Sequence, residues 1–566
     1  MTTGGDASAP EARHSQDDDS EVTPSTTVRP WRRVVGVVAT VLACLLVLFG
    51  LVLPLRLNDI SPAAFLRIPI EGLVVVALLL VLPPRARKIV GIVAGVLLGI
   101  VTIVKLLDIG FFESLGRPFD PGGDWAFFGP GIDFLNGAIG HIGAIIAIIA
   151  VILVAIALVV LMTLAVLRIS RVANSGRTAT SRILLALGVA WVVFLVTGVQ
   201  VAPGTPVAAR DAADLTVGNV QKINEDIKDQ QVFAQQMATD KFAKTPGNEL
   251  LTGLRGKNVI LVVVESYGQV AVQGSPIAPQ IDTMLRNDTK QLQAAGFGSR
   301  SAFLTSSTDG GGSWLAHSTL ESGVFINSQQ RYNEFTSSHR LTLSSAFRKA
   351  GWRNVGVIPE NTEDWPQGAV YQFQKIYDDR NVGYQGPGFA YSNMPDQYTM
   401  TAFRRAEQQP GHKPVFAEID LTSSHSPWTH QPRLVDWNAV GDGSIYDPMP
   451  TQGKSFDQVW PNPVTIRQAY GQSIQYSLTT LVQYMQRYAD KNTVMVFYGD
   501  HQPEQPVVQP DHVHRVPISI IAKDPAVLQQ VSGWGWDNGL LPSPQAPLWL
   551  MSAFRDKFLT AFSRTS

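Results

Sequence analysis

The sequence predicts a chain in two parts: a polytopic α-helical membrane domain of about five helices, then an α/β domain with a central, mostly parallel sheet. Long apolar stretches fill residues 31–202, whereas from Lys257 onward short β-branched runs alternate with helix-like segments. The mean hydropathy of +0.08 and the 45% share of hydrophobic residues fit a chain that lies partly in a membrane. These observations set the fold class before any motif is considered.

Residues 1–30 are polar and rich in Ser, Thr, Asp and Pro, which predicts a disordered tail. Each apolar stretch that follows approaches the ~20 residues that an α-helix needs to cross ~30 Å of hydrocarbon. The first stretch lacks the compact apolar core and cleavage motif of a signal peptide, so we expect it to be retained. The predicted spans are roughly 34–54, 63–82, 89–107, 139–166 and 183–201.

Basic and acidic residues alternate between successive loops. Basic residues precede the first span and separate the second from the third and the fourth from the fifth. Because basic loops favour the cytoplasm, the N-terminus is predicted to lie inside and everything after a fifth span outside. We therefore expect a multi-pass protein of the plasma membrane whose C-terminal domain is extracellular. The loops predicted to be cytoplasmic contain Arg29, Arg32, Arg33, Arg85, Arg87, Lys88, Arg168, Arg171, Arg177 and Arg182. The intervening loops contain Asp59, Asp108, Glu113, Asp120, Asp124 and Asp133.

Composition excludes several classes of function. The formal net charge is −1 and no extended basic stripe occurs, so we expect no nucleic-acid partner. The only cysteine, Cys44, lies inside an apolar run. The sequence therefore predicts no intramolecular disulfide, no cysteine-based zinc site and no cysteine nucleophile.

The remainder divides into a linker or stalk at 203–256 and a catalytic domain at 257–566. The stalk contains a polar, helix-like stretch from about residue 219 to 240. In the domain, runs that are apolar throughout predict strands covered on both faces, and ligands of such sheets bind beyond the carboxyl ends of the strands. The predicted strands are 258–265, 354–358, 415–422, 493–500 and 516–522, with helix-like segments such as 341–350 and 466–489 between them.

Two of these strands end in candidate metal ligands. Glu265 ends NVILVVVE, and Asp500 and His501 follow the run TVMVFYG. A carboxylate oxygen and an imidazole nitrogen suit Mn²⁺ or Zn²⁺. The alternatives are a helix cap or ion pair for Glu265 and a plain surface turn for the Gly-Asp-His sequence.

A glycine-rich stretch, TSSTDGGGSWLAHSTLESGVF, supplies a candidate nucleophile. Three glycines precede Ser313, which opens an apparent helix. A helix N-terminus favours an anion, and a coordinated cation would lower the pKa of the hydroxyl. The alternative is an ordinary serine cap after a flexible turn.

A loop histidine is the last candidate. His425 lies in SSHSPW, just past the strand VFAEIDLT. Imidazole can protonate a leaving oxygen or bind a phosphate, so His425 is a candidate catalytic and substrate-binding residue. The alternative is a solvated loop histidine.

Over about residues 257–525 these motifs resemble the sulfatase branch of the alkaline-phosphatase superfamily, most closely the lipoteichoic acid synthase type of phosphoglycerol transferase. The resemblance implies an alkaline-phosphatase/sulfatase-like fold with one divalent ion, most often Mn²⁺, with Zn²⁺ and Mg²⁺ as alternatives. It places Glu265, Ser313, Asp500 and His501 as the metal ligands. It also implies that Ser313 is the nucleophile, where lipoteichoic acid synthases have Thr.

The same resemblance places His425 and the segment Trp365-Pro366-Gln367 at the substrate phosphate. Trp365 and Gln367 fall where the family has Trp-x-Arg, so the expected arginine is missing. Gln can donate a hydrogen bond but cannot neutralise a phosphate, which weakens the case for phosphoglycerol as the transferred group. No motif clearly supplies a second metal site.

The sequence thus predicts a membrane-anchored, metal-dependent transferase of phosphoglycerol or phosphoethanolamine type, acting on envelope lipids or glycans through a phospho-serine. One alternative is a phosphodiesterase or phosphatase that uses the same residues. A sulfuric-ester hydrolase of the same fold is another alternative. Its formylglycine route needs Cys or Ser followed by x-Pro-x-Arg, and because Ser313 is followed by Trp-Leu-Ala-His, that route is disfavoured. A non-catalytic envelope scaffold is the remaining alternative.

Overall fold

The computed structural model describes residues 30–115, 118–121, 124–508 and 513–564. These residues form two compact units. The first contains the chain up to Val52 with Phe65–Ile100 and Ala155–Ala209, and the second contains Leu53–Ala64, Val101–Val154 and Arg210–Ser566. The tail predicted at 1–30 lies outside the described residues, apart from Pro30.

Apolar helices dominate the N-terminal part of the chain. Four of them contain stretches long and apolar enough to cross a membrane, at Val34–Val52, Pro84–Glu113, Gly140–Ser175 and Arg177–Thr197. Their large apolar side chains are exposed, with Leu185 70% and Val196 80% exposed, as expected of helices that face lipid. The helices that carry these stretches are α1 (Pro30–Val52), α3 (Pro84–Leu115), α4 (Phe128–Ser175) and α5 (Arg177–Thr197).

The span predicted at 63–82 is helical over only part of its length. Only α2 (Ile70–Val81), of 12 residues, is an apolar helix there. At 1.5 Å per residue it is about 18 Å long, short of the ~30 Å hydrocarbon core. Ile68 precedes Pro69 and is therefore biased toward extended backbone, and both residues form strand β1 (Ile68–Pro69), paired with β4 (Ala208–Ala209). Hydropathy reports apolar character and not backbone conformation.

A nine-stranded sheet forms the centre of the C-terminal part. Its order is β12-β6-β11-β10-β5-β9-β7-β8, with β13 paired to β6. Strands β10, β5, β9, β7 and β8 run parallel, and β11 is antiparallel to both of its neighbours. The strands are β5 (Asn258–Val264), β6 (Gly298–Thr305), β7 (Arg353–Val357), β8 (Lys375–Tyr377), β9 (Val415–Leu421), β10 (Thr493–Gly499), β11 (Arg515–Ala522), β12 (Asp537–Asn538) and β13 (Leu548–Leu550).

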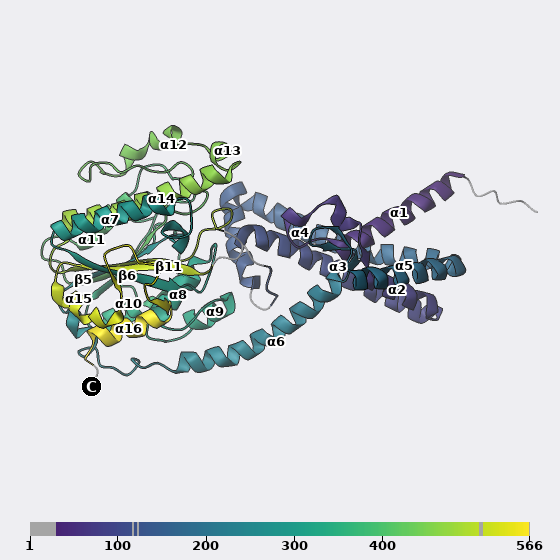
Figure 1. Ribbon diagram of the computed structural model, residues 1–566, viewed down its shortest axis with the longest axis horizontal. Coiled ribbons are helices and arrows are strands. Elements are labelled where there is room, and N and C mark those ends of the chain that lie inside the picture. Colours follow the sequence, from purple (N-terminus) through teal and green to yellow (C-terminus); the bar gives the residue numbers. More distant parts are fainter. Residues whose placement is uncertain (1–29, 116–117, 122–123, 509–512, 565–566) are drawn as a thin grey trace, which may run out of the picture. The chain divides into compact units, whose positions relative to one another are not determined.

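Helices cover both faces of this sheet (Figure 1). All seven residues of β5 are buried: Ile260, Val262 and Val264 pack into one core, and Val259, Leu261 and Val263 into the other. Such two-sided burial explains why the strands read as continuous apolar runs. The first face carries α7 (Ala278–Ala294), α11 (Asp396–Glu407) and α14 (Pro463–Tyr488), and the second carries α8 (Ser313–Ser322), α10 (Leu343–Lys349) and α16 (Ala553–Phe562).

The five predicted strands are present, each within one residue of its predicted bounds, and helices occupy both predicted helix-like segments. The predicted stalk contains α6 (Asp211–Ala238). Strand β6 was missed because Ser299, Arg300 and Ser301 interrupt its apolar pattern.

Candidate active site

The carboxyl ends of three adjacent parallel strands meet at one edge of the sheet. Val264 pairs with Gly499 on one side and with Leu421 on the other. The residues that follow these strands are therefore brought together. Gly499 is required for the close approach, because a Cβ there would overlap the carbonyl oxygen of Tyr267.

Ser313 reaches this edge from the first turn of α8. Gly310 and Gly312 have φ values of 65° and 78°, in the left-handed region that favours glycine. The N-cap of α8 is Gly312, so the alternative of Ser313 as an ordinary cap does not hold. Instead, Ser313 Oγ donates a hydrogen bond to Glu265 Oε2 (3.0 Å) and lies 3.3 Å from His501 Nε2.

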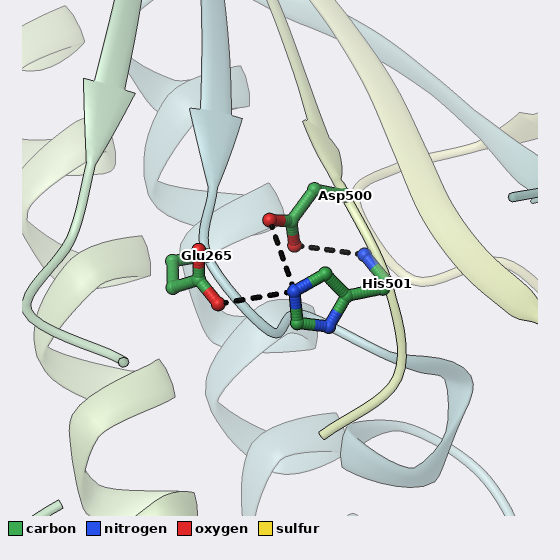
Figure 2. Close-up of side chains that lie close together, drawn as sticks. All are labelled: Glu265, Asp500 and His501. Carbon is green, nitrogen blue, oxygen red and sulfur yellow. Dashed lines mark hydrogen bonds and ion pairs between the residues drawn. The ribbon is translucent and has the colours of Figure 1, made fainter. Parts of the chain in front are cut away.

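Glu265, Asp500 and His501 form a compact cluster (Figure 2), and Ser313 Oγ contacts two of its members. His501 Nε2 lies 3.3 Å from Glu265 Oε1 and 3.4 Å from Asp500 Oδ2. Ligands about 2.0–2.2 Å from a tetrahedral ion lie roughly 3.3–3.6 Å from one another, so these separations suit one cation. The three side chains are buried, and neither Glu265 nor the Gly-Asp-His turn lies on the surface.

Neighbouring groups orient the cluster. The Asp500 carboxylate accepts, at Oδ1, hydrogen bonds from the backbone N–H groups of Ser266 and His501 (both 2.8 Å). The Nδ1 atom of His501 lies 2.7 Å from the carbonyl of Gln502, which places the proton on Nδ1 and leaves Nε2 as a ligand. Asp500 Oδ2 is buried and accepts no hydrogen bond from the described residues. Such an orphaned acceptor, in a cluster of two carboxylates and an imidazole, fits a divalent metal ion.

The charges in the cluster perturb one another strongly. Burial raises the pKa of Asp500 to about 7, and the nearby Glu265 carboxylate adds to the rise. Burial alone would lower the pKa of His501, but Asp500 and Glu265 outweigh it and raise this pKa to about 10. For Glu265, the positive charge of His501 overcomes desolvation and holds the pKa well below its usual range. A cation would replace the proton that His501 otherwise keeps.

The C-terminal domain is similar to a known protein family. Residues 257–518 match the sulfatase family. This segment is a sulfatase-family domain. The match agrees with the sulfatase-type enzyme domain that the sequence predicted in this segment. No curated protein matches the chain.

Solved structures of similar fold include lipoteichoic acid synthase LtaP from Listeria monocytogenes, 15% identical with a TM-score of 0.38, where the match covers 56% of this chain and 74% of that one. The phosphoglycerol transferase GacH from Streptococcus pyogenes, in complex with sn-glycerol-1-phosphate, is 15% identical with a TM-score of 0.33, covering 58% and 91%. The soluble domain of lipooligosaccharide phosphoethanolamine transferase A from Neisseria meningitidis is 11% identical with a TM-score of 0.31, covering 56% and 94%. These low scores carry no conclusion about substrate.

A cavity of about 580 Å³ opens beside Ser313 in the sulfatase-family domain. His425, Trp365 and Gln367 line it together with Glu265 and Ser313, and Asp500 and His501 adjoin it through their contacts with Glu265 and Ser313. The ring of His425 stacks on Tyr391 with 3.7 Å between ring centroids, and its Nδ1 lies 2.6 Å from the carbonyl of Ser426. This anchoring fixes the ring at the cavity wall.

Several residues of the sulfatase-family domain that matter here were not selected from the sequence. Hydrogen bonds to backbone carbonyls lock the strand ends together, from Ser424 Oγ to Glu265 (2.6 Å) and from Tyr470 Oη to Ser266 (2.8 Å). A second group, His317, Glu418 and Asp420, also lines the cavity. Two acids within the buried run VFAEIDL, and a histidine one helical turn after Ser313, were the signals that could have revealed this group.

Proposed function

We propose that the sulfatase-family domain transfers a phosphoryl-type group, of the phosphoglycerol or phosphoethanolamine kind, onto lipids or glycans of the cell envelope. The observation that carries this proposal is the position of Ser313 Oγ, which contacts both Glu265 and His501 at the mouth of a cavity. A carboxylate and an imidazole that contact a hydroxyl can orient it and activate it as a nucleophile. The apolar helices would keep the domain close to lipid headgroups.

Glu265, Ser313, Asp500 and His501 would hold one divalent cation, Mn²⁺ in our proposal, with Zn²⁺ and Mg²⁺ as alternatives. Bound there, it would stabilise the Ser313 alkoxide and the charge that develops on the phosphate oxygens. Glu265, Asp500 and His501 directly follow the rigid strands β5 and β10 and are buried, so they need little reorganisation to bind the cation.

In the first step Ser313 Oγ attacks the phosphorus of a phosphodiester donor, a bond from Oγ to phosphorus forms, and the bond to the leaving oxygen breaks. His425 delivers a proton to that oxygen or contacts the phosphate. In the second step an acceptor hydroxyl gives its proton to His425, its oxygen attacks the phosphorus of phospho-Ser313, and Oγ leaves as the alkoxide that begins the next cycle. Trp365 and Gln367 line the part of the cavity where the rest of the donor would lie.

We further propose that the N-terminus is cytoplasmic and that the sulfatase-family domain is extracellular. This topology needs a fifth crossing besides the four long helices. The apolar helix α2, extended by the preceding residues 62–69, is the segment that could provide it. The domain boundaries predicted at 203 and 257 belong to the same proposal.

The decisive experiment follows the headgroup of the donor. The purified full chain would be incubated with Mn²⁺ and glycerophospholipids whose glycerol or ethanolamine headgroups are isotopically labelled, and then digested for mass spectrometry. We expect the labelled phosphoryl group on the peptide that contains Ser313. Later transfer of the label to a glycan or lipid identifies a transferase, whereas release of the free headgroup phosphate identifies a hydrolase. Turnover with no label on Ser313 would contradict the mechanism.

A further inference from the structure

We propose that His317, Glu418 and Asp420 bind a second divalent cation beside Ser313. The geometry of the three side chains carries the binding, and only the role of the cation toward phosphate rests on the proposed function. His317 follows Ser313 by one turn of α8, and Glu418 and Asp420 alternate along β9. Residues two apart in a strand face the same side, so both acids point toward the face that α8 covers.

The three side chains converge on a common point. His317 Nδ1 lies 3.7 Å from Glu418 Oε1 and 3.7 Å from Asp420 Oδ1. The three ligand atoms all lie within 4.8 Å of one another. The two 3.7 Å distances from His317 Nδ1 exceed a hydrogen bond, but two ligands about 2.1 Å from one ion can lie up to about 4.2 Å apart. The cluster therefore fits a cation better than it fits direct contact.

Polar atoms of this cluster lack partners within the described chain. Glu418 is only 5% exposed, yet its Oε2 accepts no hydrogen bond, and neither does Asp420 Oδ1. His317 Nε2 is likewise without a partner. A buried acceptor left unsatisfied costs about 1–3 kcal/mol, and Asp420 Oδ1 is the unsatisfied acceptor that lies nearest His317 Nδ1, whereas Glu418 faces His317 with its other oxygen, Oε1. A cation bound between the carboxylates of Glu418 and Asp420 would satisfy these buried oxygens.

An ordinary ion pair does not account for the cluster. Burial lowers the pKa of His317 to about 4, so the imidazole is neutral at physiological pH and cannot balance the two acids. Burial and repulsion from neighbouring carboxylates raise the pKa of Glu418 and of Asp420 well above the usual range. A cation would displace the protons that these two acids otherwise hold, and the neutral imidazole with the two resulting carboxylates is a ligand set suited to Mn²⁺ or Zn²⁺.

The second cation would also supply a charge that the cavity lacks. Ser313, His425 and Gln367 line the same cavity as the cluster, and the lining contains no Lys or Arg among the described residues. Glu360 lines it as well, so a phosphate would otherwise meet mainly negative charge. A cation bound by His317, Glu418 and Asp420 would supply the positive charge toward the phosphate that Gln367, which is uncharged, cannot supply.

The test counts bound ions on the full chain in detergent. The protein would be stripped with a chelator, titrated with Mn²⁺, and analysed by elemental mass spectrometry and electron paramagnetic resonance. We expect two ions per chain, with the line broadening of two Mn²⁺ ions close together. Glu418→Gln and Asp420→Asn should each lose one ion and the broadening.

Matched variants separate the two sites. Glu360→Gln removes a carboxylate from the same cavity, but its oxygens already accept hydrogen bonds from Thr422 and Asn393, so this variant should keep both ions. A single ion in the unchanged protein, lost in Asp500→Asn and retained in Glu418→Gln, would overturn the second site and leave the proposed Ser313 centre intact. Two bound ions without a phospho-Ser313 intermediate would support the second cation site and contradict the proposed function of Ser313. Should the Glu418 and Asp420 variants fail to fold, the ion count of the unchanged protein decides.

Discussion

Ser313 Oγ donates a 3.0 Å hydrogen bond to Glu265 Oε2, although 48 positions separate the two residues in the chain. One residue opens a helix and the other follows a central strand. The contact joins a hydroxyl to the negative charge that Glu265 retains, because the pKa of Glu265 is held well below its usual range. A polarised hydroxyl at a cavity wall is the basis of the first prediction.

Ser313→Ala should reduce turnover of a phosphodiester donor by at least about 10³-fold, because no other group can form the covalent intermediate. Ser313→Thr keeps the hydroxyl and should retain measurable activity with formation of a phospho-enzyme. Steady-state kinetics and intact-protein mass spectrometry would check both variants. Equal activity of the Ala and Thr variants would argue against a nucleophilic Ser313.

Cation binding at the Ser313 centre should release protons. In the ion-free protein the pKa of His501 is raised to about 10 and that of Asp500 to about 7, and both groups must be deprotonated to act as ligands. Mn²⁺ therefore displaces about one proton between pH 7 and 10, and more below pH 7. Affinity should rise about tenfold per pH unit for each proton released.

Calorimetric titrations in buffers of different ionisation enthalpy would measure this proton release. Asp500→Asn is the control, because it removes one ligand and should abolish the high-affinity phase. An affinity independent of pH between 6 and 8 would show that His501 is not a ligand.

His425→Gln should lower kcat by about 10²–10⁴-fold if the imidazole donates the proton to the leaving oxygen. Tyr391→Ala should give a smaller loss, because it removes only the ring that stacks on His425. The exposed His412, changed to Gln, is the matched control and should leave the rate unchanged. Donors with a highly acidic leaving group should rescue His425→Gln, and failure of that rescue would restrict His425 to phosphate binding.

Gly499→Ala should destabilise the domain by about 2–4 kcal/mol, because the new Cβ would overlap the Tyr267 carbonyl at the end of β10. Gly533→Ala provides the comparison, since a Cβ there would meet no atom within 4 Å. Chemical denaturation in the presence of excess Mn²⁺ would measure both. Equal stability of the two variants would show that the close approach can relax at little cost.

Topology is open to a direct test. Reporter fusions placed after Ser61, after Val81 and after Ala202 should report alternate sides if α2 completes a crossing, with the last reporter extracellular. If α2 does not cross, a cytoplasmic N-terminus and four crossings would put the reporter after Ala202 in the cytoplasm. That result would reverse the proposed location of the sulfatase-family domain.

Five strands of the central sheet could be predicted from the local sequence, because burial on both faces gives each of them a continuous apolar run. The runs that became β5, β9 and β10 are apolar throughout because helices cover both sides, so their ends could be read and Glu265, Asp500 and His501 selected. Hydropathy was weaker for α2, where Pro69 shortens a helix whose composition alone suggested a full span.

The sequence by itself determined which residue types stand at the ends of the central strands and after the three glycines, since those positions follow from strand periodicity and chain order. Only the tertiary structure decided which strands are neighbours, and therefore that Ser313 meets Glu265 and His501. It alone brought His317 to Glu418 and Asp420. The physical reason is that contacts between distant segments depend on strand order and on which face a helix covers, and neither is written in any local pattern.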